Sequence, residues 1–347
     1  MKKHFQGENA PMSIWAPVRT SAPGRGGIAG NPSDMYGGSM LSCATKARAE
    51  CAISPANALA LSVGGEAAVI ANGDDLAMHG DRLDVARAAL AAFGIDPLRD
   101  HFDLEASTAI PMQAGLAGST ALVCAIVAAL QASSGSMQHA HHLVETVRDV
   151  EMNHLGVLCG FQDATMTVFG GLRFIDVRNR EQLRQGVDEP YVVAERLTAP
   201  AFPFILAHTG VKHHSGTVHT SLRDRWLEGE PAVVAGYARI QRIAQMGKRA
   251  LLDADWERLA ALMAENHAIQ RDLGGSGDSN ERLIRAALDA GALAAKLAGA
   301  GGGGTIIALT HEPERIGKAL MDAGADTLIE LDPEAAGLVV EHQENQA

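Results

Sequence analysis

The chain has 347 residues, which at about 150 residues per domain favours two domains. Hydrophobic residues make up 47% and charged residues 20%, a composition that excludes a disordered chain. The formal net charge is −12 and no run of lysine or arginine is present, which argues against a nucleic acid as the main partner. A small anionic ligand, which needs only a local positive site, is not excluded.

The cysteines and the apolar runs bear on location. No two of the four cysteines are spaced as CxxC, so we expect buried thiols in a reducing cytoplasm rather than a zinc site or a redox pair. The first residues lack the apolar core of a signal peptide, and the apolar run at 121–130 is too short to span a bilayer. We therefore expect a cytoplasmic protein without a membrane partner, as a monomer or a homodimer.

The first half of the chain predicts strands and helices in a mixed order. Residues 39–72 carry β-type runs, interrupted by Pro55 and by a Gly–Gly pair. Residues 165–177 are expected to form two strands joined by a second Gly–Gly turn. Helical spacing occurs in three ranges, the second of them apolar on all sides and therefore buried: residues 81–93, 119–131 and 142–154.

A charged stretch that ends at Pro200 gives the predicted domain boundary, with domains at residues 17–200 and 201–347. The second domain is expected to alternate strands and helices. Its predicted strands are residues 202–208, 305–309, 327–331 and 338–341. Its predicted helices are residues 231–251, 255–273, 280–290 and 314–322.

Three glycine-rich segments carry the chemistry. The first, residues 22–38, cannot be a dinucleotide-binding fingerprint because Asn31–Pro32 prevents a helix from starting there. Taken alone, it is equally typical of a surface loop. The third, residues 297–305, contains four consecutive glycines, which indicates that something approaches this backbone closely; a flexible hinge is the alternative.

The second segment, residues 110–121, runs into the apolar helix. Unpaired amides and the dipole at a helix N-terminus favour an anion, and Ser119 and Thr120 add hydroxyl groups. No lysine follows, so this is not a Walker A loop. We favour phosphate binding over an ordinary serine N-cap.

Order and spacing together resemble the motifs of the GHMP kinase family, from residue 20 to about residue 310. The resemblance implies an α+β fold with two-domain GHMP kinase architecture. The N-terminal domain would be like the second domain of ribosomal protein S5 and the C-terminal domain ferredoxin-like, with MgATP in the cleft between them. Residues 30–34, 115–119 and 155–163 are similar to the glucuronokinase-like branch, while heptose-phosphate kinases share Gln162–Asp163 and residues 169–171.

The resemblance also assigns roles. Asp163 would be the catalytic acid, as base or as orienting group for the acceptor hydroxyl, and Arg25 would offset developing phosphoryl charge. Glu151 and Ser119 would hold Mg²⁺, with water as the alternative to Ser119. Without the resemblance, Glu151 would be interpreted as a solvated acid on a helix and Asp163 as a turn residue. The ATP-binding residues would be Pro111, Gly115, Leu116, Ala117, Gly118, Ser119, Thr120, Gly301 and Gly302.

The acceptor residues follow from the same resemblance. They would be Asn31, Ser33, Asp34, Gly37, Gly38 and Gly301. Lys212 and His213, in a loop that follows a predicted strand, could add positive charge for a carboxylate or phosphate of the acceptor; a solvated loop is an equal alternative. Galactokinases usually carry Glu–His where this chain has Asn31–Pro32, which argues against galactose. His139, His141 and His142 resemble a metal cluster but favour a surface helix start, because adjacent helical positions face different ways.

We therefore expect an ATP- and Mg²⁺-dependent kinase that phosphorylates a sugar hydroxyl, with the anomeric hydroxyl of a uronic acid as first choice. A heptose phosphate is the enzymatic alternative. A degenerate nucleotide or sugar sensor is the non-enzymatic one, and the presence of both Asp163 and Arg25 counts against it. The sequence leaves open the acceptor and the oligomeric state.

Overall fold

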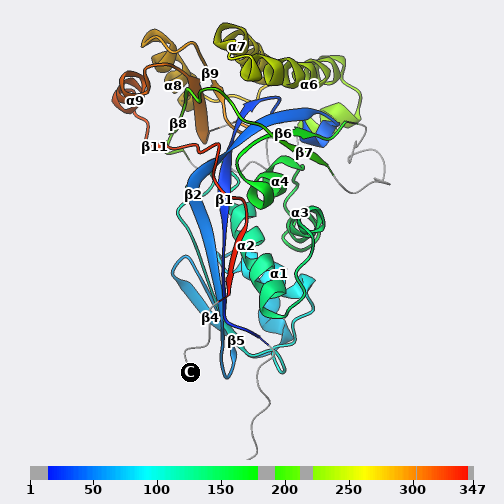
Figure 1. The fold of residues 1–347 in the computed structure, drawn as a ribbon. Helices are drawn as coiled ribbons and strands as arrows, with labels where there is room; N and C mark the ends of the chain where they lie inside the picture. The colour runs from blue at the N-terminus through cyan, green and yellow to red at the C-terminus, as the bar shows by residue number, and fades with distance from the viewer. Residues whose placement is uncertain (1–14, 179–191, 212–221, 302, 343–347) are drawn as a thin grey trace, which may run out of the picture.

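The computed structural model describes residues 15–178, 192–211, 222–301 and 303–342. Its ribbon has a long lower part built on one sheet and an upper part in which helices surround a smaller sheet (Figure 1). Among the residues described, no helix is both long enough and apolar enough to cross a membrane.

The larger sheet has eight strands in the order β12-β1-β2-β5-β3-β4, with β6 on the other half of β2 and β7 beside β6. All of these pairs are antiparallel except β3 with β5. The strands are β1 (Val18–Ala29), β2 (Ser39–Pro55), β3 (Leu59–Val63), β4 (Glu66–Ile70), β5 (Phe102–Thr108), β6 (Leu172–Asp176), β7 (Val193–Arg196) and β12 (Val339–His342).

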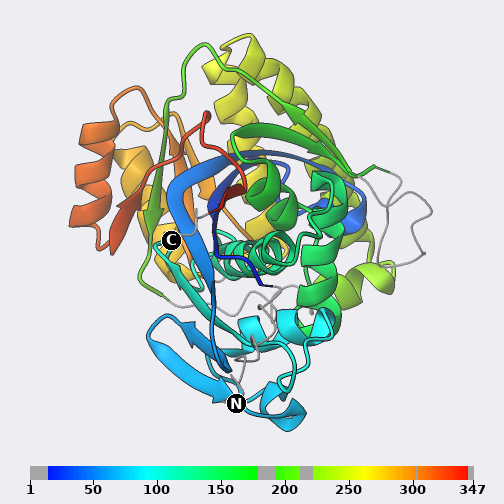
Figure 2. The ribbon, with the colours of Figure 1, turned by 60° about the horizontal axis from the view of Figure 1, so that its bottom comes forward.

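One face of this sheet is covered by helices (Figures 1 and 2). They are α1 (Asp84–Ala92), α2 (Gly118–Ser133), α3 (Ala140–Asp149) and α4 (Gln162–Phe169), with the short segments η2 (Gly73–Leu76) and η3 (Val150–His154). A third short segment, η1 (Asp34–Tyr36), packs elsewhere, with Tyr36 stacked on Tyr237. Helix α2 is the centre of the core, since every residue in it except Ser119 is buried. The Thr20 hydroxyl on β1 donates to the Ala125 carbonyl, 2.7 Å away, and so ties the sheet to α2.

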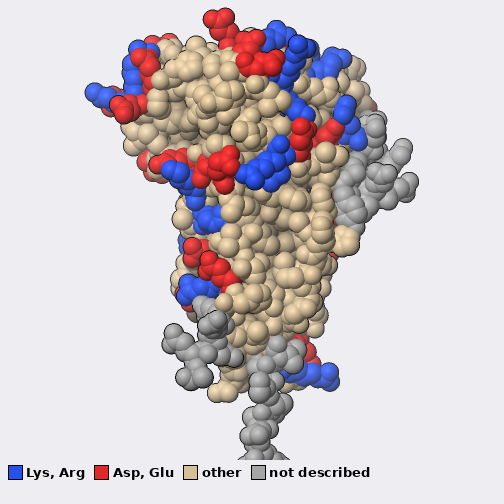
Figure 3. Space-filling model, in the orientation of Figure 1, with Lys and Arg blue, Asp and Glu red and all other residues tan. Residues whose placement is uncertain are grey.

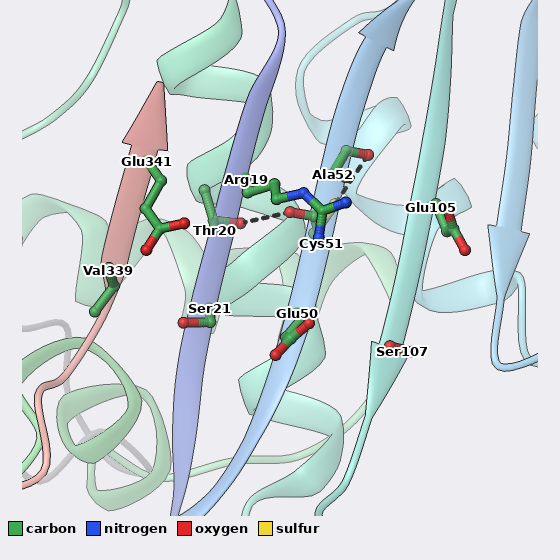
Figure 4. Close-up of a pocket in the computed structure, with 10 residues that line it drawn as sticks. All are labelled: Arg19, Thr20, Ser21, Glu50, Cys51, Ala52, Glu105, Ser107, Val339 and Glu341. Atoms are coloured by element: carbon green, nitrogen blue, oxygen red, sulfur yellow. Dashed lines mark hydrogen bonds between the residues drawn. The ribbon is translucent and has the colours of Figure 1, made fainter. Parts of the chain in front are cut away.

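The opposite face of the sheet carries charged side chains that point away from the helices (Figure 4). Arg19, Glu50, Glu105 and Glu341 are exposed there and line a shallow hollow of about 280 Å³. In the face shown in Figure 3, acidic and basic side chains are interspersed.

The smaller sheet is antiparallel, in the order β11-β8-β10-β9. Its elements are β8 (Phe204–His208), α6 (Pro231–Leu252), α7 (Trp256–Asp272), α8 (Asp278–Asp289), β9 (Ala294–Leu297), β10 (Thr305–Leu309), α9 (Pro313–Asp322) and β11 (Thr327–Ile329). A second apolar cluster, with Leu283 of α8, Ile306 of β10 and Leu320 of α9, holds α8 and α9 on this sheet.

After β11 the chain leaves the smaller sheet, and its last strand, β12, pairs with β1. The larger sheet therefore contains both the first and the last strand of the described chain. Arg48 on β2 holds this returning segment, because its guanidinium donates to the carbonyls of Ala336 at 2.7 Å and Gly337 at 2.6 Å. The predicted division at residue 200 stays a prediction.

The structure confirms the predicted helices within one or two residues, with two exceptions. Helix α1 begins at Asp84, three residues after the predicted start, and in the range 142–154 α3 ends at Asp149 and η3 continues as a π-helical segment. The strand expected at residues 165–169 is wrong, because these residues form the end of α4. Alternating threonines suggested a strand, but α4 is packed in the core and Thr167 donates its hydroxyl to Ala164 O one turn back, at 3.0 Å. Residues 22–29, which could equally have been a surface loop, lie in the buried strand β1.

Candidate active site

The three glycine-rich segments meet where the upper and lower parts of the molecule join. The Arg25 amide of the first segment donates to Leu116 O of the second at 3.0 Å. The Gly27 amide donates to Ala298 O of the third at 2.9 Å. A Cβ on Gly299 would lie 2.7 Å from Gly115 O, so only glycine allows these two backbones to approach. The glycine run therefore has a definite neighbour, the backbone of the second segment.

Arg25 and Asp163 form an ion pair at this junction. Arg25 lies on β1 and Asp163 in the first turn of α4. The guanidinium approaches Asp163 Oδ1 with Nε at 2.8 Å and Nη2 at 2.6 Å. The Arg25 side chain is 8% exposed and that of Asp163 is 29% exposed, so one face of the carboxylate remains open to a ligand.

The same guanidinium touches both other glycine segments. Arg25 Nη1 donates to Gly115 O at 2.5 Å and lies 3.5 Å from Ala298 O. Arginine offers several donors in a fixed fork, so one side chain can tie the carboxylate to two loops. The predicted cation therefore lies beside the predicted acid and fixes the loops around it.

The first turn of α4, which carries Asp163, is held from two sides. Asp34 Oδ2 accepts a hydrogen bond from the Gln162 amide at 3.0 Å, and the Gln162 side chain donates to the Ser42 hydroxyl. On the other side Arg148 donates from Nε to Gly160 O at 2.9 Å and stacks over the Phe161 ring at 3.6 Å. These contacts set the direction of the Asp163 side chain.

Glu151 is a buried carboxylate in η3, opposite the start of α2. Its Oε1 accepts a hydrogen bond from the Thr120 hydroxyl at 2.7 Å. Among the described residues its Oε2 has no hydrogen-bond partner of ordinary geometry. Burial raises the pKa of Glu151 to about 7; the charge of Asp163 acts in the same direction, while the Thr120 hydrogen bond and the Cys159 thiol oppose it.

This arrangement fits Mg²⁺. A buried carboxylate oxygen without a partner is costly and gains most from a cation. No group of three acidic, histidine or cysteine side chains able to hold a metal by themselves occurs in the described part of the chain, and His139, His141 and His142 form none. Mg²⁺ is commonly held by one or two carboxylates together with substrate phosphates. Glu151 would be such a ligand, with Thr120 orienting it.

The loop before α2 is suited to a phosphate. Gly115 and Ala117 have positive φ angles of 70° and 61°, which turn the backbone into the helix. The amides of Gly118, Ser119 and Thr120 open the helix and have no carbonyl one turn before them. Pro111 and Ser119 are partly exposed, while Leu116, Ala117 and Gly118 are buried. Ser119 makes no hydrogen bond to a described residue, so its hydroxyl is free for a ligand.

The residues expected at the acceptor have different surroundings. Ser33 is fully buried and donates to Ser39 O at 3.3 Å, and Gly38 packs directly against it. Gly37 has a φ of 73° and ends η1. Asp34 is 7% exposed, and its Oδ1 has no partner among the residues described. Of the described side chains expected to bind the phosphoryl acceptor, that of Asp34 therefore keeps an oxygen available for a ligand.

Asn31 is fully buried, and both ends of its amide are used by the protein. It contacts the third glycine segment rather than an open surface. Gly301 has a φ of 99° and packs against Gly275. Lys212, His213 and Gly302 lie outside the described residues.

Sequence reasoning missed four buried polar residues around this site: Arg148, Asn266, Gln270 and Lys296. Arg148 resembles any helix arginine in the sequence. Lys296 could have been noticed, because it interrupts the apolar run of residues 292–298.

Two family models match the chain. The model for the GHMP kinases N terminal domain matches residues 82–171, and the model for GHMP kinases C terminal matches residues 248–325. Residues 82–171 and 248–325 thus correspond to the N-terminal and C-terminal domains of the GHMP kinases, and the chain has their two-domain α+β architecture. The structure of Lactococcus lactis galactokinase complexed with galactose has the same fold, with a TM-score of 0.77 and 15% identity over 94% of this chain and 95% of that one.

Several curated relatives are similar in sequence. Glucuronokinase 1 of Arabidopsis thaliana is 31% identical over 213 residues, which cover 58% of this chain and 56% of that protein. A D-glycero-alpha-D-manno-heptose 7-phosphate kinase of Campylobacter jejuni is 26% identical over 209 residues, covering 58% and 59%. Mevalonate kinase of Pyrococcus furiosus is 28% identical over 226 residues, covering 63% of each. The chain thus matches less than two thirds of the length of these relatives.

Proposed function

We propose that the protein is an ATP-dependent kinase that transfers a phosphoryl group to a sugar hydroxyl. The observation that carries the proposal is the Arg25–Asp163 ion pair, 2.6 Å apart, where the three glycine segments meet. The pair also lies close enough to Glu151 for the charge of Asp163 to raise the pKa of Glu151. Phosphoryl transfer needs positioning and charge stabilisation more than covalent help from the protein, and these groups supply both.

Each group has a defined task in this proposal. MgATP, when bound, supplies the phosphoryl group and a metal charge. The amides at the start of α2 bind phosphate oxygens, with Ser119 beside them, and Glu151 holds the metal. Arg25 occupies Asp163 Oδ1 and leaves Oδ2 to accept the proton of the acceptor hydroxyl or to orient it. Asp34 Oδ1 accepts a hydrogen bond from a second sugar hydroxyl.

For the acceptor we propose a uronic acid phosphorylated at its anomeric hydroxyl. Support comes from the similarity to Glucuronokinase 1 and from Asn31–Pro32 in place of the Glu–His pair of galactokinases. The similarity to a heptose 7-phosphate kinase supports a sugar phosphate as the second candidate.

The test is a coupled ADP-release assay over uronic acids, neutral hexoses, heptose phosphates and mevalonate, followed by determination of the phosphorylated carbon by ³¹P and ¹³C NMR. We expect turnover on glucuronic or galacturonic acid and a product with phosphate on the anomeric carbon. Turnover only on a sugar phosphate would contradict the uronic acid and favour the second candidate. Binding of MgATP without turnover on any sugar would favour a sensor and contradict the kinase proposal.

A further inference from the structure

Lys296 is a fully buried lysine that the proposed chemistry does not use. It lies on β9, and its Nζ donates to Asn31 Oδ1 at 2.8 Å and to Leu297 O. No ion pair joins it to a carboxylate within the described ranges. Burial, with the positive charge of Arg25 in the same direction, lowers the pKa of Lys296 to about 7. A buried amine without an anion is costly, so a lysine at this position is expected to have a specific use.

Asn31 connects this lysine to the third glycine segment. Its Nδ2 lies 3.4 Å from Leu297 O and 3.2 Å from Gly299 O, and its Oδ1 accepts from Lys296. Its backbone is fixed as well, because Asn266 Nδ2 on α7 donates to Asn31 O at 3.2 Å. The side-chain amide of Asn31 is therefore fully committed inside the protein.

The carbonyl groups of residues 297–299 are all satisfied from the interior. Leu297 O accepts hydrogen bonds from Lys296 Nζ and Asn31 Nδ2. Gly299 O accepts from Asn31 Nδ2 and, at 3.3 Å, from Gln270 Nε2. Ala298 O accepts a hydrogen bond from the Gly27 amide at 2.9 Å. Buried carbonyls held in this way fix the rotation of their peptide planes.

The amides that follow have no hydrogen-bond partner in the described part of the chain. Those of Gly299, Ala300 and Gly301 donate to no described residue. They lie beside the second segment, since a Cβ on Gly299 would touch Gly115. Free backbone amides in a glycine-rich turn are donors for an anion.

We propose that Lys296 and Asn31 are a positioning pair for nucleotide binding, which holds the carbonyls of Leu297 and Gly299 inward and so presents the amides of residues 299–301 to phosphate. This rests on the proposed function, since it needs a nucleotide at the glycine segments. It changes the expected role of Asn31 from contacting the acceptor to shaping the nucleotide site. Neutral lysine still donates two hydrogens, so the pair persists when Lys296 loses its proton.

The experiment measures binding of a non-hydrolysable ATP analogue with Mg²⁺ by calorimetry, in the full chain and in Lys296→Met, Asn31→Leu and the double variant. We expect each single variant to bind at least about 10-fold more weakly, and the double variant no more weakly than the weaker single one, because the two side chains act as one unit. The proposal would be overturned if the fold-losses of affinity in the two single variants multiplied in the double variant, or if both single variants bound the analogue as tightly as the wild type.

Two controls separate positioning from a general loss of stability. Ile70→Ala removes a buried side chain on β4, at the far edge of the larger sheet, and should destabilise the fold while the affinity stays within 2-fold of wild type. Lys296→Gln keeps a side-chain N–H donor and should bind the analogue more tightly than Lys296→Met. Equal weakening by Ile70→Ala, or no difference between the two Lys296 variants, would mean that stability alone explains the loss.

A measurement on the wild type covers the case in which the variants do not fold. Hydrogen exchange of the amides of residues 299–301 should slow at least about 10-fold when the analogue and Mg²⁺ bind. Unchanged exchange in a wild type that binds the analogue would overturn the positioning pair but not the kinase. A wild type that binds no analogue at all would contradict the proposed function itself.

Discussion

Arg25 and Asp163 are 138 positions apart in the chain, yet the Arg25 Nε lies 2.8 Å from Asp163 Oδ1. The arginine comes from a central strand and the aspartate from the first turn of a helix packed on that strand. The pair forms only when β1, α4 and both neighbouring glycine segments are in place. The integrity of the site therefore reports on the packing of the whole junction.

Replacing the acid tests its role directly. Asp163→Asn keeps the size of the side chain but removes its capacity to accept a proton, so we expect kcat to fall by about 10²–10⁴. Affinity for MgATP should change by less than about 3-fold, measured by calorimetry. Asp103→Asn, at an exposed position of β5, is the matched control and should keep wild-type turnover. Wild-type kcat in Asp163→Asn would rule out Asp163 as the catalytic acid.

Arg25 is expected to act through its shape as well as its charge. Arg25→Lys keeps the positive charge but cannot reach Asp163, Gly115 and Ala298 together, so kcat should fall by at least about 10-fold. Urea unfolding should show a loss of about 1–3 kcal/mol, because buried acceptors lose their donor. Full activity in Arg25→Lys would show that charge alone is sufficient.

Glu151 should control the metal requirement. Glu151→Gln removes the buried charge but keeps the Thr120 hydrogen bond, so the Mg²⁺ concentration for half-maximal activity should rise at least about 10-fold. The titration of activity with Mg²⁺ at saturating ATP measures this. Glu50→Gln on the exposed sheet face should leave the requirement unchanged. An equal requirement in both variants would place the metal elsewhere.

Lys296 predicts a pH dependence of stability. Its pKa is about 7 in the folded protein against 10.5 for a free lysine. Between these values the unfolded chain binds a proton that the folded chain does not, so the free energy of unfolding rises with pH in this window. Relative to Lys296→Met, the wild type should gain up to about 1.4 kcal/mol per pH unit above pH 7. Urea unfolding at pH 7 and pH 9 measures the difference, and parallel pH profiles would contradict the assigned burial cost.

The close approach of two glycine segments can be tested by adding one methyl group. A Cβ on Gly299 would lie 2.7 Å from the backbone oxygen of Gly115, which cannot move away cheaply. Gly299→Ala should therefore cost about 1–3 kcal/mol in unfolding free energy and weaken nucleotide binding. Gly73→Ala meets no atom within 4 Å and is the matched control. Equal behaviour of the two variants would show that the contact between the segments is unimportant.

Sequence reasoning found the family, the glycine segments and most elements, because these are local patterns with local causes. The alternating threonines of residues 165–169 misled it, since in α4 tertiary packing overrides the strand preference of β-branched residues. The contact between Asn31 and Lys296 could not be found, because this hydrogen bond joins positions 265 residues apart. The predicted roles of Ser119, Asp34 and the other site residues stay predictions.

The pairing of β12 with β1 sets the order in which the molecule can be completed during synthesis. Val18 pairs with His342 and Ser21 with Val339, so among the described residues the outer edge of the first part of β1 gains its partner only when nearly the whole chain has been made. An unpaired edge strand is a site where chains associate wrongly. The larger sheet therefore gains its last strand only after the smaller sheet has been synthesised, and a nascent chain shorter than about 340 residues exposes this edge.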